Sequence, residues 1–485
     1  MNAAAGVDLD AWARRLADER IDTIRFAWCD LHGVTHCKSL SADESLRAMQ
    51  AGVGMVSTLL LKDTSDRTAW KVFERGGLDG VPGFGQLGSA ANLLLFADPA
   101  SFRVLPWSPG TAWVQGQLHR ADRTPVELDT RRILVLALER LARAGYALDC
   151  GLEVEFHIYR IDDASPSLDP EQAAWPGLPP KVSMIHPGYS LLGEAWADLA
   201  DEPLRIVRHT AAALGLRLAS LEIELGPSQV EAVFEPCDAL EAADAMVRFR
   251  NLVRQTLRRA GYHASFMCRP PFPNVMASGW HLHHSLRLLR DDSNAFRRDA
   301  PAAGTGRSDA AQLLSPIGDA WLAGLLAHAP ASAALCTPTT NGYARLRPNA
   351  LAPTAIVWGR DNRGAMLRVI GETGDASTRI ENRLGEPAAN PYLYVAAQVY
   401  AGLDGIARGL VSPRASDSPY DPAGARLPST LADALDALRD DGVLREGLGD
   451  GVVAWFDRIK RSEIARRAAA EDPLDFDRRE YFSRI

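Results

Sequence analysis

Four short segments of the chain alternate charged and apolar residues, and this pattern constrains the fold more than any other feature. They are residues 152–158, 221–225, 281–285 and 379–383. In the first of them, Glu153, Glu155 and His157 alternate with Val154 and Phe156. Because successive side chains of a strand point to opposite faces, each segment has one apolar and one charged face. One such strand is typical of a sheet with a solvated side, whereas four together predict a shared charged face.

Length and charge exclude several classes of function. The chain has 485 residues, of which 47% are hydrophobic, enough for one large or two ordinary domains. A net charge of −8 disfavours nucleic acid and anionic lipid as partners. The most apolar stretch, residues 321–336, contains His328 and Pro330 and is too short to span a bilayer. We therefore expect no nucleic-acid partner and no membrane partner.

Cysteine usage and the first residues indicate a compartment. The six cysteines are scattered and form no C-x-x-C pair, which argues against a thiolate zinc site and a disulfide scaffold. The N-terminus becomes acidic at once, unlike a signal peptide. Both features predict a cytoplasmic protein.

The order of elements predicts an α+β fold with two domains. Short strands and turns are expected between residues 21 and 113, with a flexible loop at 76–88. The boundary is placed between residues 118 and 119. Helices are expected from Asp129 to Gly145, from Asp238 to Ala260, and from Asn390 onward. Segment 291–312 is expected to be an exposed loop.

The charged strands predict a cation site. Carboxylates packed on one sheet face would repel one another and have raised pKa values unless a cation neutralised them. Many oxygens with one imidazole suit Mg²⁺ or Mn²⁺ better than zinc. Seven arginines lie between residues 345 and 383, and guanidinium groups are preferred partners of phosphate and carboxylate. The combination suggests metal-assisted phosphoryl transfer from a nucleotide, and no Walker-type loop is present.

Several motifs, in the same order, give the chain a resemblance to the glutamine synthetase superfamily. They are the strand 151–156, the Glu…Gly…Gln-x-Glu segment 224–231, the Ser-Gly-x-His-x-His-x-Ser-Leu strand 278–286, and segments 341–346, 379–383, 387–393 and 475–483. The similarity covers essentially the whole chain. Within this superfamily, the chain is similar to the γ-glutamylanilide synthase-like enzymes of amine degradation.

The resemblance implies an architecture and a reaction. It implies an N-terminal β-grasp domain over residues 1–118 and a catalytic domain over 119–485, with a curved antiparallel sheet flanked by helices. It implies a homo-oligomer of stacked rings, such as a dodecamer, with active sites between subunits. ATP would phosphorylate the γ-carboxylate of glutamate, and a nitrogen nucleophile would then displace phosphate.

The resemblance also implies residue roles. Two to three Mg²⁺ or Mn²⁺ ions are implied, one held by Glu155, Glu224 and Glu231, and another by Glu153, His281 and Glu381. The residues implied for ATP and phosphate are Arg363, which we assign a catalytic role, Arg368, Arg379, His283 and Ser285. Those implied for glutamate are Arg345, Arg383 and Ala277. Asp30 would reach a neighbouring subunit's site and handle the incoming nitrogen.

Departures from the family pattern bear on the amine. Leu351 stands where glutamine synthetases usually have a glutamate that closes over the ammonium ion, and Met276-Ala277 replaces the usual Asn-Gly. Trp280 is larger than the usual methionine. An apolar lining penalises a desolvated small cation and favours an amine with a hydrophobic body. We therefore assign Leu351, Trp280 and Met276 to an amine pocket.

The hypothesis is a glutamate–amine ligase that makes a γ-glutamylamide. An aromatic amine fits best, because anilines are uncharged at neutral pH, and a polyamine or alkylamine fits less well. The alternatives are an ordinary glutamine synthetase, a non-catalytic assembly protein of the same fold, and a guanidino kinase. Intact candidate ligands argue against the second alternative, and the N-terminal domain would have no role in the third.

Overall fold

The N-terminal domain of the computed structural model is built on a six-stranded sheet. The structure describes residues 8–79, 81, 90–300, 310–347, 351–421 and 424–485. The strands run in the order β2-β1-β6-β4-β3, with β5 paired to β6. The elements are α1 (Leu9–Asp18), β1 (Thr23–Cys29), β2 (Thr35–Ser41), α2 (Ala42–Ala51), β3 (Val53–Val56), β4 (Asn92–Ala97), β5 (Arg103–Val104) and β6 (Thr111–His119).

The larger part of the chain forms a nine-stranded sheet in the order β13-β14-β15-β12-β7-β10-β9, with β8 and β11 paired to β7. Its strands are β7 (Tyr146–Asp163), β8 (Lys181–Met184), β9 (Leu218–Ile223), β10 (Gln229–Asp238), β11 (Tyr262–Ser265), β12 (Trp280–Leu288), β13 (Trp358–Arg360), β14 (Leu367–Ile370) and β15 (Arg379–Asn382). The pairs are antiparallel, as expected, except β13 with β14, which run parallel. All four segments with charged faces thus belong to one sheet.

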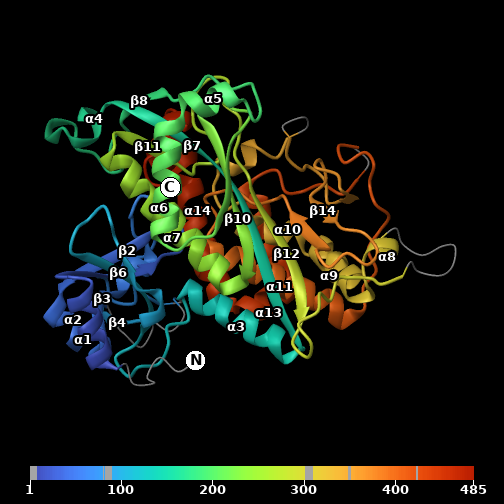
Figure 1. Cartoon of the computed structure of the whole chain (residues 1–485), viewed down its shortest axis with the longest axis horizontal. Coiled ribbons are helices and arrows are strands. Elements are labelled where there is room, and N and C mark those ends of the chain that lie inside the picture. Colours follow the sequence, from blue (N-terminus) through green and yellow to red (C-terminus); the bar gives the residue numbers. More distant parts are fainter. Residues whose placement is uncertain (1–7, 80, 82–89, 301–309, 348–350, 422–423) are drawn as a thin grey trace.

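Helices flank this sheet (Figure 1). They are α3 (Thr130–Arg143), α4 (Ser165–Leu168), α5 (Glu194–Leu199), α6 (Asp201–Ala213), α7 (Ala239–Arg259), α8 (Ala310–Leu313), α9 (Pro316–Ala327), α10 (Ala329–Cys336), α11 (Pro391–Arg408), α12 (Leu431–Asp440), α13 (Gly442–Leu448), α14 (Asp450–Ala468) and α15 (Pro473–Asp477). The architecture is α+β, as predicted.

Local capping explains where the predicted helices begin. Asp129, Asp238 and Asn390 each accept a hydrogen bond from a backbone N–H of the following turn. Such caps satisfy donors that the first turn leaves without partners. Pro391 then occupies the first helical position of α11, where its missing N–H costs nothing. These three helix predictions are confirmed.

The apolar face of the large sheet packs on helices. On β7, Val154, Phe156 and Ile158 are fully buried. The ring of Phe156 lies 5.6 Å from that of Phe249 on α7, edge to face. Trp280 of β12 packs in the same way on Tyr394 of α11, at 4.9 Å. The opposite face of the sheet is therefore left for the charged residues.

Two loop predictions need comment. Segment 291–312, expected to be an exposed loop, buries Phe296 completely because its ring packs near Trp321 of α9. Its residues 301–309 lie outside the described part of the chain, as does most of the loop predicted at 76–88.

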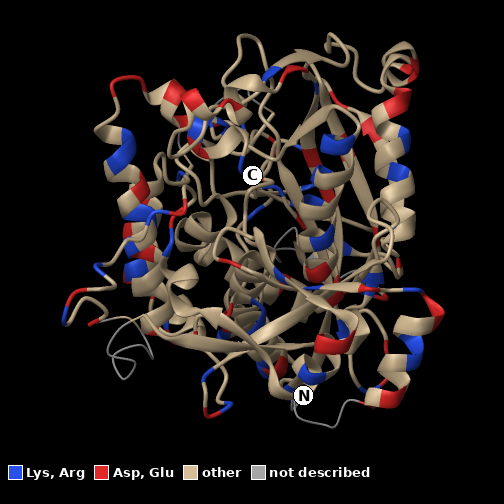
Figure 2. Cartoon of the chain, turned by 90° about the vertical axis from the view of Figure 1, so that its left-hand side faces the viewer, with Lys and Arg blue, Asp and Glu red and all other residues tan. Residues whose placement is uncertain are grey.

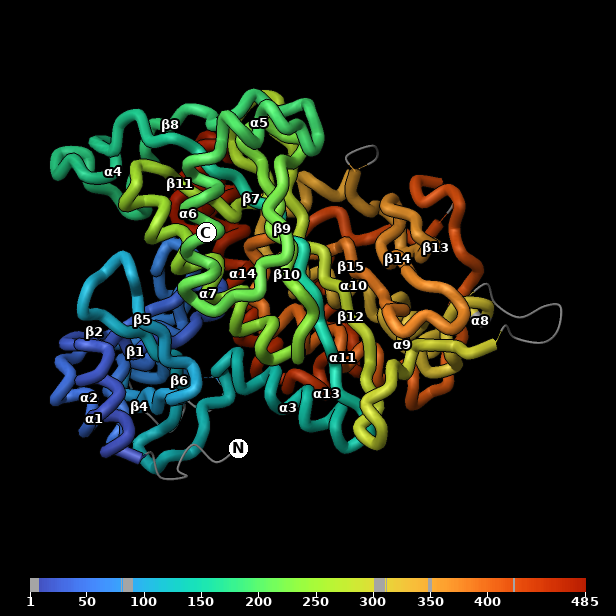
Figure 3. Tube along the Cα trace, in the orientation of Figure 1, coloured from blue at the N-terminus to red at the C-terminus, as the bar shows by residue number. Residues whose placement is uncertain are grey.

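Charge and connectivity complete the architecture. Residues of both signs alternate along the outer helices (Figure 2). The N-terminal domain and the C-terminal helices lie side by side (Figure 3), and Trp455 of α14 donates its indole N–H to the carbonyl of Leu60 at 2.7 Å. Within the described residues, no helix combines the length and hydropathy that a membrane span requires.

Candidate active site

The register of four strands brings the charged side chains together. Glu231 of β10 lies directly opposite Glu155 of β7. On the other side of β7, His281 of β12 lies opposite Glu153. His283 is opposite Glu381 of β15. Cross-strand neighbours share a face, so these residues converge on the face that the helices do not cover.

Three groups of these side chains have the spacing of metal ligands. Within each group, one donor atom per residue lies within 4.8 Å of the others. The groups are Glu155, Glu224 and Glu231; Glu153, Glu231 and His281; and Glu153, His283 and Glu381. The first is the ligand set that the resemblance implies, whereas the second implied set is divided between the other two groups, which share Glu153.

The electrostatics fit a bound cation. Burial raises the pKa of Glu231 to about 9, and the charges of Glu155 and Glu153 add to this effect. Burial and the charge of Glu224 raise the pKa of Glu155 to about 7. Burial and the charge of Arg383 lower the pKa of His281 to about 4, which keeps its imidazole neutral, as a metal ligand must be. The Nε2 atom of His281 is buried without a hydrogen-bond partner.

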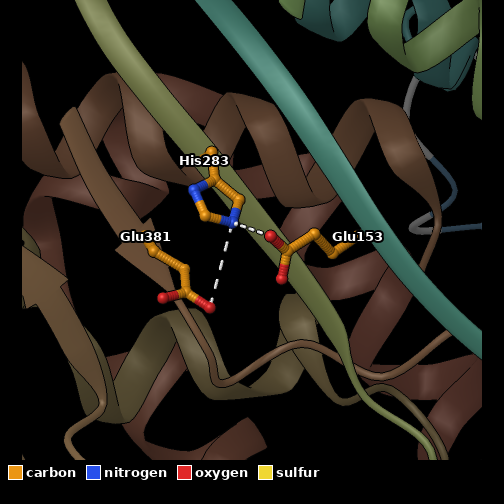
Figure 4. Close-up of side chains that lie close together, drawn as sticks. All are labelled: Glu153, His283 and Glu381. Carbon is orange, nitrogen blue, oxygen red and sulfur yellow. Dashed lines mark ion pairs between the residues drawn. The ribbon is translucent and has the colours of Figure 1, made fainter. Parts of the chain in front are cut away.

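His283 belongs to this cluster as well as to the predicted nucleotide site. Its Nε2 atom lies 2.9 Å from Glu153 Oε1 and 3.9 Å from Glu381 Oε1 (Figure 4). On its other side, Arg379 Nε lies 3.2 Å from His283 Nδ1. The prediction gave His283 a nucleotide role alone, and the structure adds a candidate metal-ligand role.

Two of the predicted arginines neutralise Glu381. Its carboxylate accepts from Arg383, at 2.5 Å, and from Arg368, at 3.1 Å. Although burial raises the pKa of Glu381, the electrostatic interactions with the His281 ring and the Arg383 guanidinium outweigh it and lower this pKa. The carboxylate is therefore held ionised beside the cluster.

Arg363 and Arg345 differ in exposure to solvent. Arg363 is exposed in the β13–β14 loop, and its charge opposes the effect of burial on the pKa of Glu224. Arg345 is buried and donates to the carbonyls of Arg383 and Gly385. A Cβ on Gly279 would lie 2.4 Å from the Arg345 guanidinium, so a larger residue there would displace this side chain.

A cavity adjoins the cluster at Glu153. It has a volume of 630 Å³, within the range of small-molecule sites. The predicted nucleotide residues His283, Ser285 and Arg379 line it, together with backbone at Gly151. Its position beside Glu153 suits a ligand whose phosphates approach the carboxylates.

Asp30 lies away from the cluster, in the turn after β1. It lines a separate cavity of 220 Å³ with His32 and His36. The described contacts of Asp30 include none of the cluster residues, and its action at a neighbouring subunit's site stays a prediction.

The residues predicted for the amine pocket occupy different environments. Leu351 is 60% exposed and has a φ of 57°, a conformation that is costly for a leucine. Met276 packs on Gly226, and the Ala277 carbonyl accepts from Gln229 at 3.3 Å. Trp280 is fully buried between β12 and α11, on the face opposite His281, so the structure corrects its assignment to the amine pocket.

Gln229 is a site residue to which the sequence reasoning gave no role. Its amide contacts Glu155, Ser278 and the backbone at Gly226. The available signal was its place in the Gln-x-Glu segment, two residues before Glu231 and therefore on the same face.

Known proteins resemble this chain along its whole length. The family profile of the glutamine synthetase catalytic domain matches residues 127–479. A gamma-glutamylanilide synthase from an Acinetobacter species is 37% identical over 477 residues, covering 96% of this chain and 93% of that protein. A gamma-glutamylethanolamide synthetase, GlnA4, from Streptomyces coelicolor is 32% identical, with coverage of 96% and 93%. A solved complex of GmaS with ADP superimposes with a TM-score of 0.75 at 28% identity, covering 95% of this chain and 97% of that chain.

The chain therefore belongs to the glutamine synthetase family. It is an ATP-dependent ligase that joins glutamate to an amine.

Proposed function

We propose that this ligase joins the γ-carboxylate of glutamate to an organic amine with a hydrophobic, preferably aromatic, body. The observation that carries the proposal is Leu351, an exposed leucine held in a left-handed backbone conformation. Exposed apolar side chains in strained conformations are costly and persist where function needs them. A leucine offers an incoming amine an apolar surface and no charge.

The relatives support the same class of product. One is named for a γ-glutamylanilide and another for a γ-glutamylethanolamide, so both names describe amides of glutamate with organic amines. The relative named for the aromatic product has the higher identity, 37% against 32%.

The chemistry proceeds in two transfers. The γ-phosphoryl group of ATP moves to a γ-carboxylate oxygen of glutamate, giving γ-glutamyl phosphate and ADP. The amine nitrogen then attacks the acyl carbon, a C–N bond forms, and phosphate leaves with the electrons of the broken C–O bond. The nitrogen loses one proton, which we assign to Asp30 of a neighbouring subunit. Arg363, whose charge acts on Glu224, would stabilise charge on the transferred group.

Two to three Mg²⁺ or Mn²⁺ ions would be held by the three ligand groups. When bound, such ions neutralise phosphate charge and position the phosphoryl group. His283, Ser285, Arg368 and Arg379 would hold the nucleotide, and Arg345, Arg383 and the Ala277 backbone would hold glutamate. Met276 would adjoin Leu351 at the amine.

A panel of amines tests the proposal. Full-length protein with ATP, Mg²⁺ and glutamate is assayed against ammonia, ethanolamine, a polyamine and aniline, with phosphate release and product mass as readouts. We expect aniline-type amines to give the highest kcat/KM. Ammonia exceeding every organic amine would instead establish an ordinary glutamine synthetase.

A substitution at the key position sharpens the test. Leu351→Glu restores a carboxylate for a small cation, so activity with ammonia should rise and activity with bulky amines should fall. Leu289→Glu is the matched control, because Leu289 is also an exposed leucine and directly follows β12. If the Leu351 variant leaves the amine preference unchanged, the apolar-pocket argument is wrong.

A further inference from the structure

One buried amide is bonded to three segments that build the candidate metal site. Gln229, the first residue of β10, is only 2% exposed. Its Nε2 atom lies 3.1 Å from Glu155 Oε2, 3.1 Å from Ser278 Oγ and 3.3 Å from the Ala277 carbonyl. Its Oε1 atom accepts the backbone N–H of Gly226 at 2.9 Å. Because a backbone N–H can only donate, the amide orientation is fixed, with its nitrogen toward Glu155.

These contacts divide the Glu155 carboxylate into a held and a free oxygen. Oε2 accepts from Gln229 and from the backbone N–H of Gly279, which lies 2.8 Å away. Oε1 instead lies 3.7 Å from His281 Nε2, on the side of the charged cluster. Two donors on one oxygen restrict the rotation of the carboxylate and keep the other oxygen directed at the cluster.

The amide is itself held in place. A Cβ on Gly226 would lie 2.5 Å from Gln229 Oε1, so only glycine lets the turn close on the amide. Ser278 Oγ, which accepts from Gln229, lies 3.3 Å from Nδ1 of the fully buried His157. The chain from His157 to Glu155 is thus continuous.

We propose that Gln229 is a positioning residue of the metal centre, which orients Glu155 so that one carboxylate oxygen stays available to a divalent cation. This inference rests on the metal centre in the proposed function. Partners that orient ligands in this way typically change metal affinity by about 10–100-fold when they are removed. Gln229 does not touch the reacting atoms and acts through Glu155.

Metal binding to the full-length protein, without ATP or glutamate, tests the role directly. Titration calorimetry with Mn²⁺ should show stronger and weaker classes of sites in the wild type. Gln229→Met keeps the volume but removes the donor and the acceptor. We expect it to weaken Mn²⁺ by about 10–100-fold at the class that contains Glu155 and to leave the class at Glu153 and His283 unchanged.

Two further variants make the result decisive. Gln115→Met is the matched control, because Gln115 is a buried glutamine whose amide contacts Asp244 and Tyr392 instead of the cluster. It should lower stability without changing Mn²⁺ affinity. Ser278→Ala removes one hydrogen-bond partner of the Gln229 amide and should weaken Mn²⁺ binding at the class of sites that contains Glu155, by a smaller factor. This variant tests the positioning role if Gln229→Met fails to fold.

The outcomes separate two failures. The positioning role is overturned, and the proposed metal centre left intact, if Gln229→Met binds Mn²⁺ at both classes of sites with wild-type affinity. If Gln229→Met does not fold, the same result in Ser278→Ala overturns it. A wild type that binds no Mn²⁺ would overturn the metal centre and this inference with it.

Discussion

Local hydrogen bonds give Asp30 an unusually acidic carboxyl group. Its Oδ1 atom accepts the backbone N–H groups of His32 and Val34, at 2.8 and 2.9 Å, and its Oδ2 atom lies 2.9 Å from His36 Nε2. Although burial raises its pKa, the hydrogen bond and charges of the histidines lower it to about 2. The His36 ring is stacked on Trp28, which keeps it beside the carboxylate. Asp30 is thus ionised at every pH at which the enzyme is expected to work.

Asp30→Asn tests the role of that charge. We expect amide formation to fall by about 10²-fold or more, the range of a lost proton acceptor, while the variant stays folded. Product mass and phosphate release, measured together, check whether the loss lies in the amine step. Asp66→Asn is the control, because Asp66 lines the same cavity but pairs with Arg484. Equal losses in both variants would contradict a specific role for Asp30.

At the scale of elements, one imidazole joins several helices of the catalytic domain. His328 lies between α9 and α10, with Nδ1 2.6 Å from Asp441 Oδ2 and Nε2 3.0 Å from Asp404 Oδ2. Asp404 belongs to α11 and also pairs with Arg408, while Asp441 caps α13. Burial lowers the pKa of His328, but the hydrogen bonds to the two carboxylates outweigh it and raise this pKa.

The raised pKa sets the sign of a pH effect. A group whose pKa is higher in the folded state stabilises the protein fully below its unfolded value, here 6.5, and less as pH rises through the folded value. His328→Gln should therefore lower the free energy of unfolding by about 1.5–3 kcal/mol below that pH and by less in mildly alkaline solution. Urea unfolding at several pH values measures this difference. The control His209→Gln, on an exposed part of α6, should show no such dependence. A loss of stability in His328→Gln that does not change with pH would contradict the ion pairs of His328 with Asp404 and Asp441.

At the scale of the whole molecule, the exposed apolar side chains are unevenly distributed. Half of the large ones among the described residues lie between Leu168 and Leu199, along the edge formed by α4, β8 and α5 (Figure 1). They include Tyr189, Leu191 and Leu192, which are 58%, 55% and 62% exposed. Exposed apolar side chains gathered along one edge of a protein are typical of protein–protein contacts. We therefore predict that this edge makes subunit contacts in the homo-oligomer of stacked rings that the family resemblance implies.

Charges at this edge should disturb assembly. The double variant Leu191→Asp, Leu192→Asp is expected to shift the protein from a large oligomer to smaller species, because each carboxylate would be buried unpaired in the interface. Sedimentation velocity measures the change. Leu289→Asp, directly after β12, is the control and should leave the oligomer intact. A wild type that sediments as a monomer would contradict the assembly.

Local features of the fold could be predicted from the sequence. Period-two alternation predicted β7, β12 and β15, and cap residues such as Asp129 and Asn390 predicted where helices start. Both signals depend only on residues that are close in the sequence. The same alternation already placed Trp280 opposite His281. The prediction that Trp280 lines the amine pocket is wrong because its side chain, although large, lies on the buried face of β12 against α11.

How these strands combine could not be predicted from the sequence, because it depends on the packing of the whole chain. Neighbour order and register, which pair Glu231 with Glu155 and His283 with Glu381, depend on contacts between distant segments that local patterns leave open. The contacts of Gln229 with Glu155 and of His328 with Asp441 likewise join residues far apart in the sequence. Local pattern gives each strand its charged face, but a site exists only where packing of the whole chain brings those faces into one register.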